Sequence, residues 1–86
     1  MARTAYKTWI DENPLRKWRL ENDLSIMAVA SMLGAGMSTV QTWENGAHWP
    51  KPESFEKIGG LIGDPNIEES WQAWLDSRPS WNSTKQ

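Results

Sequence analysis

Residues 24–46, LSIMAVASMLGAGMSTVQTWENG, contain the strongest structural signals in the chain. Ser25 is a good N-cap for a first helix, because its hydroxyl can accept a hydrogen bond from a free backbone N–H of the first turn. Gly34 suits the left-handed conformation that commonly ends a helix. A second helix begins at Gly36 or Met37 and ends at Asn45-Gly46. The stretch therefore predicts two short helices joined by a tight turn.

The apolar residues of this stretch indicate how its two helices pack. In the first helix, Val29, Ala30 and Leu33 face inward. Ala30 is small enough to let the second helix cross close by. In the second helix, Val40 and Trp43 form an apolar i, i+3 pair, and Val40 is placed to pack back onto the first helix. We therefore expect the two helices to fold as one unit.

Three further helices are predicted at residues 14–22, 52–62 and 65–77, and there is no strand candidate. Each begins with a proline, which costs no hydrogen bond in the first turn of a helix. The side chains expected to face the core are Leu15, Trp18, Phe55, Ile58, Ile62, Ile67, Trp71, Trp74 and Leu75. Gly59 and Gly60 each cost up to about 1 kcal/mol relative to Ala inside a helix. We therefore expect another helix, or a Trp ring, to approach these glycines closely.

The N-terminal segment, residues 1–12, permits two interpretations. Tyr6, Trp9 and Ile10 have the i, i+3, i+4 spacing of a short amphipathic helix. Arg3 and Lys7 equally permit a flexible basic arm. The segment is therefore predicted as an arm or a short helix.

The prediction for the whole chain is an all-α fold, a compact domain of five helices at residues 13–77. Residues 78–86 are expected to form a flexible C-terminal tail, because Arg78-Pro79 breaks the last helix. A chain of 86 residues is enough for one domain. Seven Trp are expected mostly in its core, with one or two available for a partner surface.

The amino-acid composition indicates where in the cell the protein is expected. There is no Cys, which excludes disulfides and thiolate metal sites. No apolar run is long enough to span a bilayer, and residues 1–10 lack the apolar core of a signal peptide. We therefore expect a cytoplasmic protein with no membrane contact.

No catalytic constellation is present in the sequence. His48 is the only His, and a lone loop His is far more often solvated or structural than a general base. No nucleophile–base pair can be assembled without it, no cluster has metal-ligand spacing, and no Gly-rich phosphate loop precedes a helix. We expect neither enzymatic activity nor a cofactor, and no small-molecule ligand.

Charge is unevenly distributed along the chain, whose net charge is −2. Residues 1–20 contain five basic and two acidic side chains, whereas residues 21–50 contain three acidic side chains and no Lys or Arg. A DNA-binding protein gathers positive charge on one face, because phosphate contacts dominate affinity. Here that charge can come only from residues 1–20, Lys51 and Lys57.

The spacing of the second helix leaves four polar or flexible side chains facing outward: Met37, Ser38, Gln41 and Thr42. Gln can pair bidentately with adenine, Ser and Thr can bond base edges or phosphates, and Met can touch a thymine methyl. These side chains are therefore candidates for reading bases.

Residues 15–63 resemble the Cro/XRE repressor family of helix-turn-helix proteins. The matching features are Leu24-Ser25, Ala30, Leu33-Gly34, Ser38-Thr39-Val40, Glu44-Asn45-Gly46, Pro50, Ile58 and Gly63. The resemblance implies a lambda-repressor-like fold, with the helix-turn-helix at about residues 25–45 and its second helix in the DNA major groove. On this basis Met37, Ser38, Gln41 and Thr42 would read bases. The resemblance also implies a structural ion pair between Arg19 and Glu44.

The DNA backbone contacts expected in this fold come from residues on both sides of the second helix. They are Arg16, Lys17, Asn45, Gly46, His48 and Lys51. Asn45, Gly46 and the loop after them would approach phosphate, and the basic residues would flank the helix-turn-helix.

Three departures from the family pattern each remove a polar contact. Ile26 replaces a common Gln, Gly36 replaces a common Ser or Thr, and the outer face of the first helix carries Met27 and Met32 in place of charges. An apolar exposed patch can mark an interface. Alternatively, the N-terminal segment or the tail, through Trp9 or Trp81, covers this patch.

These sequence features support two alternative functional hypotheses. The leading one is a sequence-specific, phage-like transcriptional repressor that binds double-stranded DNA as a homodimer, since one short helix reads few base pairs. Its dimer or partner surface is expected around Trp71 and Trp74, with Met27 and Met32 as further candidates. The alternative is a non-enzymatic module on the same fold that binds or inhibits a host protein.

Overall fold

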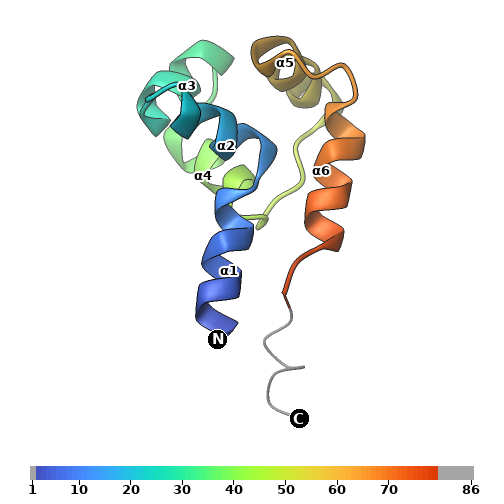
Figure 1. The fold of residues 1–86 in the computed structure, drawn as a ribbon. Coiled ribbons are helices and arrows are strands. Elements are labelled where there is room, and N and C mark those ends of the chain that lie inside the picture. Colours follow the sequence, from blue (N-terminus) through green and yellow to red (C-terminus); the bar gives the residue numbers. More distant parts are fainter. Residues whose placement is uncertain (1, 80–86) are drawn as a thin grey trace.

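The computed structural model describes residues 2–79, and this part of the chain contains six helices and no strand. The helices are α1 (Ala2–Asp11), α2 (Pro14–Glu21), α3 (Ile26–Leu33), α4 (Met37–Glu44), α5 (Pro52–Ile62) and α6 (Ile67–Asp76). Figure 1 shows α2 to α5 gathered at one end of the molecule, with α1 and α6 extending from that cluster in the same direction. The predicted all-α class is confirmed, and the five predicted helices correspond to α2–α6.

Local sequence signals set the ends of α2 and α3. The Asn13 side-chain oxygen accepts from the backbone N–H of Leu15 at 3.0 Å and of Arg16 at 2.9 Å. The Ser25 hydroxyl accepts from the N–H of Ala28 at 3.1 Å. Gly34 ends α3 with a φ of 66°, the left-handed value that glycine adopts without a Cβ clash. These predicted caps are confirmed.

The core draws one fully buried side chain from each of the five predicted helices. These are Leu15, Val29, Val40, Ile58 and Trp71. Around them lie further side chains predicted to face inward, either buried or half-buried against the core: Trp18, Ala30, Leu33, Trp43, Phe55, Ile62, Ile67, Trp74 and Leu75. The side-chain spacing in the sequence therefore predicted the inner face of each helix correctly.

The N-terminal segment folds as a helix instead of an arm. Trp9 is buried, and Tyr6 and Ile10 pack partly buried against the core. The i, i+3, i+4 spacing is thus explained by burial of α1. Of the predicted tail, Arg78 and Pro79 are described, whereas residues 80–86, including Trp81, lie outside the described residues.

Two details around α5 and α6 differ from the prediction. The last helix begins at Ile67, two residues later than expected, because Asp64 accepts the Asn66 N–H at 2.9 Å and holds Pro65-Asn66 in a turn. A methyl group added to Gly59 would lie 2.8 Å from the Asp64 carbonyl oxygen and 3.0 Å from Ile67 Cγ2. The close approach is therefore present there, but not to a Trp ring. Gly60 has no such neighbour within 4 Å.

None of the helices between residues 2 and 79 has the length and apolar character needed to cross a membrane.

Candidate nucleic-acid interface

The turn between α3 and α4 fixes how α4 is presented. The Ala35 N–H donates to the Ala30 carbonyl at 2.9 Å, and Gly36 is extended where α4 begins. Val40, on the inner face of α4, is fully buried in the same core cluster as Val29 and Ala30 of α3. One face of α4 is therefore held against α3, and the opposite face is left to solvent.

Four residues on the outer face of α4 are exposed to solvent. Met37, at 48% exposure, is followed by Ser38, Thr39 and Gln41. Thr42 is half-buried, and its hydroxyl donates to the Thr39 carbonyl at 2.8 Å, which leaves that hydroxyl oxygen free to accept only. The structure therefore places all four predicted base-reading residues on one side of α4, with Thr42 the least accessible. It adds Thr39, which sequence reasoning missed.

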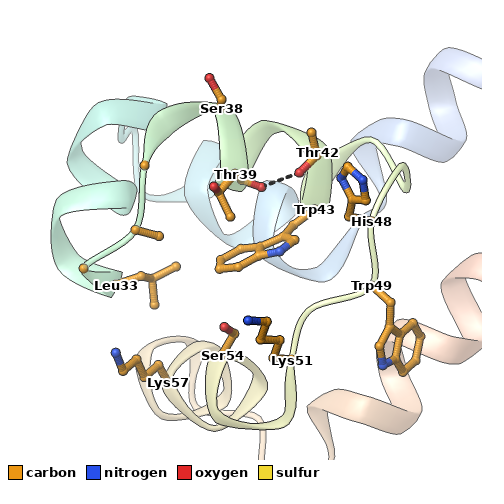
Figure 2. A pocket seen from close by; sticks show the side chains of 13 residues that line it. Leu33, Ser38, Thr39, Thr42, Trp43, His48, Trp49, Lys51, Ser54 and Lys57 are labelled. Carbon is orange, nitrogen blue, oxygen red and sulfur yellow. Dashed lines mark hydrogen bonds between the residues drawn. The ribbon is translucent and has the colours of Figure 1, made fainter.

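A groove of about 650 Å³ separates α4 from α5 and the loop that joins them (Figure 2). From α4 it is lined by Ser38, Thr39, Thr42 and Trp43, and from the loop and α5 by His48, Lys51, Ser54 and Lys57. In Figure 2 the ammonium groups of Lys51 and Lys57 extend from the side opposite α4. Lys51 was predicted as a DNA-backbone contact, Lys57 was named only as a source of positive charge, and Ser54 was not predicted. The i, i+3 spacing of Ser54 and Lys57 could have indicated them, because a helix starting at Pro52 puts both positions on one face.

The groove is positively charged although the protein is acidic overall. No Asp or Glu is among its lining residues, and no carboxylate of the described residues lies within ion-pair distance of Lys51 or Lys57. The acidic Glu56, by contrast, lines a separate depression together with Glu68 and Glu69. Lys57 of α5 therefore lies on the side of α4, whereas Glu56 lies on the side of α6.

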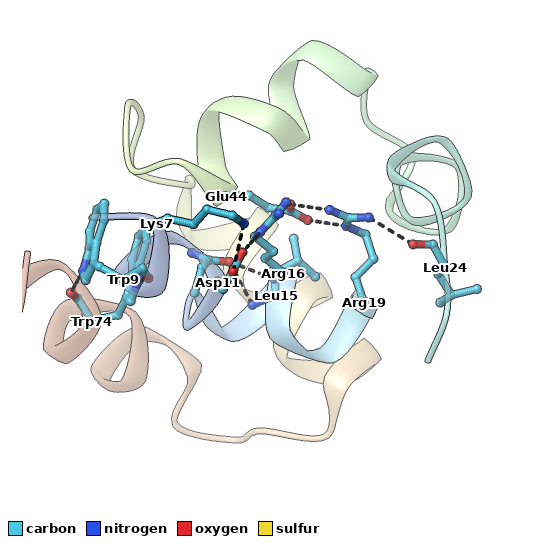
Figure 3. A network of polar contacts seen from close by, with 10 residues as sticks. Lys7, Trp9, Asp11, Leu15, Arg16, Arg19, Leu24, Glu44 and Trp74 are labelled. Atoms are coloured by element: carbon cyan, nitrogen blue, oxygen red, sulfur yellow. Dashed lines mark hydrogen bonds and ion pairs between the residues drawn. The ribbon is translucent and has the colours of Figure 1, made fainter. Parts of the chain in front are cut away.

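A buried ion pair ties α2 to the end of α4 (Figure 3). Arg19 donates from Nε to Glu44 Oε2 at 2.9 Å and from Nη2 to Glu44 Oε1 at 3.0 Å. Its Nη1 donates to the Leu24 carbonyl at 3.0 Å, just before α3. Both charged side chains are almost fully buried. The expected pairing is present, and its three bonds fix the positions of α2, α3 and α4 relative to one another.

Arg16, expected to contact the DNA backbone, has partners within the chain. Its Nε donates to Asp11 Oδ1 at 2.9 Å, and its Nη1 lies 3.6 Å from Glu44 Oε1. The hydrogen bond from Arg16 lowers the pKa of the Asp11 carboxyl; partial burial opposes this shift, and Lys7, 3.2 Å away, adds to it. Arg16 would have to give up these partners to bind phosphate. Lys17 is exposed on the same helix.

The loop after α4 turns Gly46 inward and His48 outward. Asn45 accepts the Ala47 N–H at 2.9 Å through its side chain, and the Ala47 and His48 N–H groups both donate to the Thr42 carbonyl. The Gly46 N–H donates to the Trp43 carbonyl, and its own carbonyl accepts from Arg78. Both backbone groups of Gly46 therefore have partners, whereas His48 is exposed at the groove.

The structure buries Trp71 and Trp74, the two side chains of the last helix that were predicted to form a dimer or partner surface. Trp71 is 0% and Trp74 5% exposed, because both rings lie in the core. Met27 and Met32 are exposed at 64% and 54%. Trp9, one of the two side chains proposed to cover these methionines, does not do so, because its ring stacks on Trp74. The second proposed cover, Trp81, lies outside the described residues.

No set of three or more His, Cys, Asp or Glu within residues 2–79 is arranged to hold a metal ion.

Comparison with known proteins adds two findings. The model of the Helix-turn-helix family matches residues 15–63, which run from α2 to the end of α5 and contain the whole groove. The chain is also 37% identical over 54 residues to the cryptic phage CTXphi transcriptional repressor RstR of Vibrio cholerae. That alignment covers 63% of this chain and 49% of the repressor, so the chain spans about half the length of the curated relative it matches. No solved structure matches the chain.

Proposed function

Because the chain belongs to the Helix-turn-helix family, we propose that it is a sequence-specific DNA-binding regulator of the repressor type. One observation supports this most directly. The exposed face of α4 borders a groove that contains Lys51 and Lys57 and is lined by no carboxylate. Double-stranded DNA fits such a surface, because it is a polyanion whose base edges are accessible in the major groove. The similarity to a protein named as a phage transcriptional repressor points the same way.

In the proposed complex, α4 enters the major groove. Gln41 pairs with adenine through its amide, Ser38 bonds a base edge or a phosphate, and Met37 contacts a thymine methyl. Thr42 accepts a hydrogen bond from a base amino group, because its own proton is engaged with Thr39. A good bidentate pair discriminates against the wrong base by roughly 1–3 kcal/mol.

The DNA backbone lies along the groove between α4 and α5. Lys51 and Lys57 neutralise phosphate charge, while Ser54 and His48 add hydrogen bonds. Lys17 and Asn45 remain further candidates at the edges. Each neutralised phosphate contributes about −0.9 to the slope of log affinity against log salt. Binding should therefore weaken as salt rises.

Regulation would follow from occupancy of an operator, which blocks polymerase. A homodimer is expected, because one eight-residue helix reads few base pairs. Two copies would bind half-sites about one helical turn, 34–36 Å, apart. The role requires access to DNA, which fits the cytoplasmic location expected from the sequence, and it involves no catalysis.

A second candidate function is supported by the thioethers exposed on α3. Met27 and Met32 offer an apolar surface without charges, which fits a protein partner better than a phosphate backbone. In this version the chain is a protein-interaction module, and the groove is not used for DNA.

Selection from a random-sequence duplex library tests the proposal. The regulator is expected to enrich one motif. Gln41→Ala should relax preference at a single position with a loss of roughly 1–3 kcal/mol. The matched control is Gln72→Ala, the same change at an exposed position of α6. If no motif is enriched and a host protein is captured stably, the interaction module replaces the regulator.

A further inference from the structure

The two helices outside the family match are fastened to each other. The Trp9 indole N–H of α1 donates to the Trp74 carbonyl of α6 at 2.6 Å, and the Trp74 indole N–H donates to the Trp9 carbonyl at 2.6 Å. The two rings stack in parallel with centroids 4.1 Å apart. Figure 3 shows both rings beside the polar network of α1 and α2. We call this pair the Trp9–Trp74 clasp.

The clasp lies against the first part of the loop after α4. A methyl group added to Gly46 would lie 2.9 Å from Trp9 Cη2 and 3.3 Å from Trp74 Cη2. The guanidinium of Arg78 lies over the Trp9 ring, 5.0 Å from its centroid, and donates to the Gly46 carbonyl at 3.3 Å. Gly46 has a φ of 81°, so a side chain there is disfavoured by backbone conformation as well as by space.

The far end of the same loop is also held by aromatic contacts. Trp49 packs edge-on to Phe55 with centroids 5.0 Å apart, and Phe55 packs on Trp71 at 5.4 Å. Trp71 in turn packs on Trp74 at 6.0 Å, which closes the connection to the clasp. Between these two anchored ends lie Ala47 and His48, whose N–H groups share the Thr42 carbonyl of α4.

We propose that Trp9, Trp74 and Arg78 are positioning residues for the DNA-backbone contact. They fix the loop at Gly46, so that His48 and Lys51 face the groove beside α4. This inference rests on the proposed DNA-binding function and assigns a task to α1 and α6, which lie outside the family match. Arg78 is exposed and is not among the residues that line the groove; it contacts the Trp9 ring and donates to the Gly46 carbonyl.

Arg78 offers the sharpest test, because it is exposed and its loss should not unfold the core. Arg78→Lys keeps the charge but loses the planar stack on Trp9, and Arg78→Gln loses both. Both variants are expected to bind the selected duplex roughly three- to tenfold more weakly, the range of one net hydrogen bond, with the wild-type salt slope. Lys7→Gln on α1 controls for loss of an exposed positive charge and should bind as wild type.

A DNA-free measurement distinguishes failure of this inference from failure of the proposed function. In Arg78→Gln, the amides of Ala47 and His48 are expected to exchange with solvent faster, while the buried Val40 amide of α4 keeps its wild-type rate. If wild type binds no duplex, the proposed function fails, and this exchange result still decides whether Arg78 holds the loop. Unchanged exchange overturns the inference. So does retained affinity in Arg78→Lys with a salt slope reduced by about 0.9 in Arg78→Gln, because that result makes Arg78 a phosphate contact.

Discussion

The ion pair between Arg19 and Glu44 gives the most quantitative prediction about the helix-turn-helix scaffold. Replacing Arg19 by Met leaves a carboxylate that is 3% exposed without its bidentate partner, and it frees the Leu24 carbonyl. Breaking a buried pair from one side costs roughly 3–5 kcal/mol. Here Arg16 Nη1, 3.6 Å from Glu44 Oε1, can move closer and compensate in part. We therefore expect a loss of about 3 kcal/mol of unfolding free energy.

Urea denaturation and thermal melting measure this loss. For a domain of this size, about 3 kcal/mol lowers the melting temperature by roughly 12–24 °C. The double variant Arg19→Met/Glu44→Met should recover most of the stability, because an apolar pair removes the stranded charge. If the single variant folds too weakly to measure, Arg19→Lys, which keeps the charge without the planar fork, should fall between it and wild type.

If Arg19→Met lowers the free energy of unfolding by less than about 1 kcal/mol, the value typical of an exposed pair, the Arg19–Glu44 pair does not stabilise the scaffold as a buried one. A different result would be a single variant that keeps wild-type stability but loses its preference for the selected DNA sequence. In that case Arg19 would be a DNA contact and not a structural residue.

Three further predictions concern charge and packing. In the double variant Lys51→Gln/Lys57→Gln, the salt slope of DNA binding should fall by about 1.8 per protomer, since two phosphate contacts are removed. Asp11→Asn should reduce stability near neutral pH by less than about 1 kcal/mol; because the bound guanidinium lowers the Asp11 pKa, this difference should begin to shrink as the pH falls below about 4 and be lost once the pH is below the lowered pKa. Gly59→Ala should destabilise by roughly 1–3 kcal/mol, whereas Gly60→Ala, with open space around it, should stabilise by roughly 0.5–1 kcal/mol.

For each of these three predictions, one experimental outcome would contradict it. An unchanged salt slope in the lysine variant, measured by titration at several salt concentrations, removes the groove from the DNA contact. A difference for Asp11→Asn that is as large in urea melts at pH 3 as at pH 7 means that the carboxylate is not what stabilises the wild type. Equal effects of the two glycine substitutions in the same assay contradict the close approach of Ile67 to Gly59.

Features governed by neighbouring residues were predictable from the sequence. The caps at Asn13 and Ser25 and the left-handed Gly34 each depend on two or three adjacent positions, and all three are present. The inner faces of the helices were predictable for the same reason, because burial follows the helical period. The Arg19–Glu44 pair was implied by family resemblance and is present in the structure.

Features that join distant segments were not predictable. The Trp9–Trp74 clasp connects residues 65 positions apart, and no local pattern distinguishes an α1 helix that docks there from a free arm. The periodic Trp71 and Trp74 mark an apolar face, but the sequence does not say whether the core or a partner covers it. Likewise, Lys57 joins the site only because α5 lies across the groove from α4.

A paired salt titration shows whether α4 and the adjoining lysine groove recognise a DNA sequence. The wild-type chain is titrated against the duplex enriched by selection and against a scrambled duplex of equal length and composition. If α4 and the groove do so, the enriched duplex should bind at least about 10³-fold more tightly than the scrambled one, and both affinities should fall as salt rises. Equal affinities for the two duplexes, or binding that does not change with salt, would contradict this prediction.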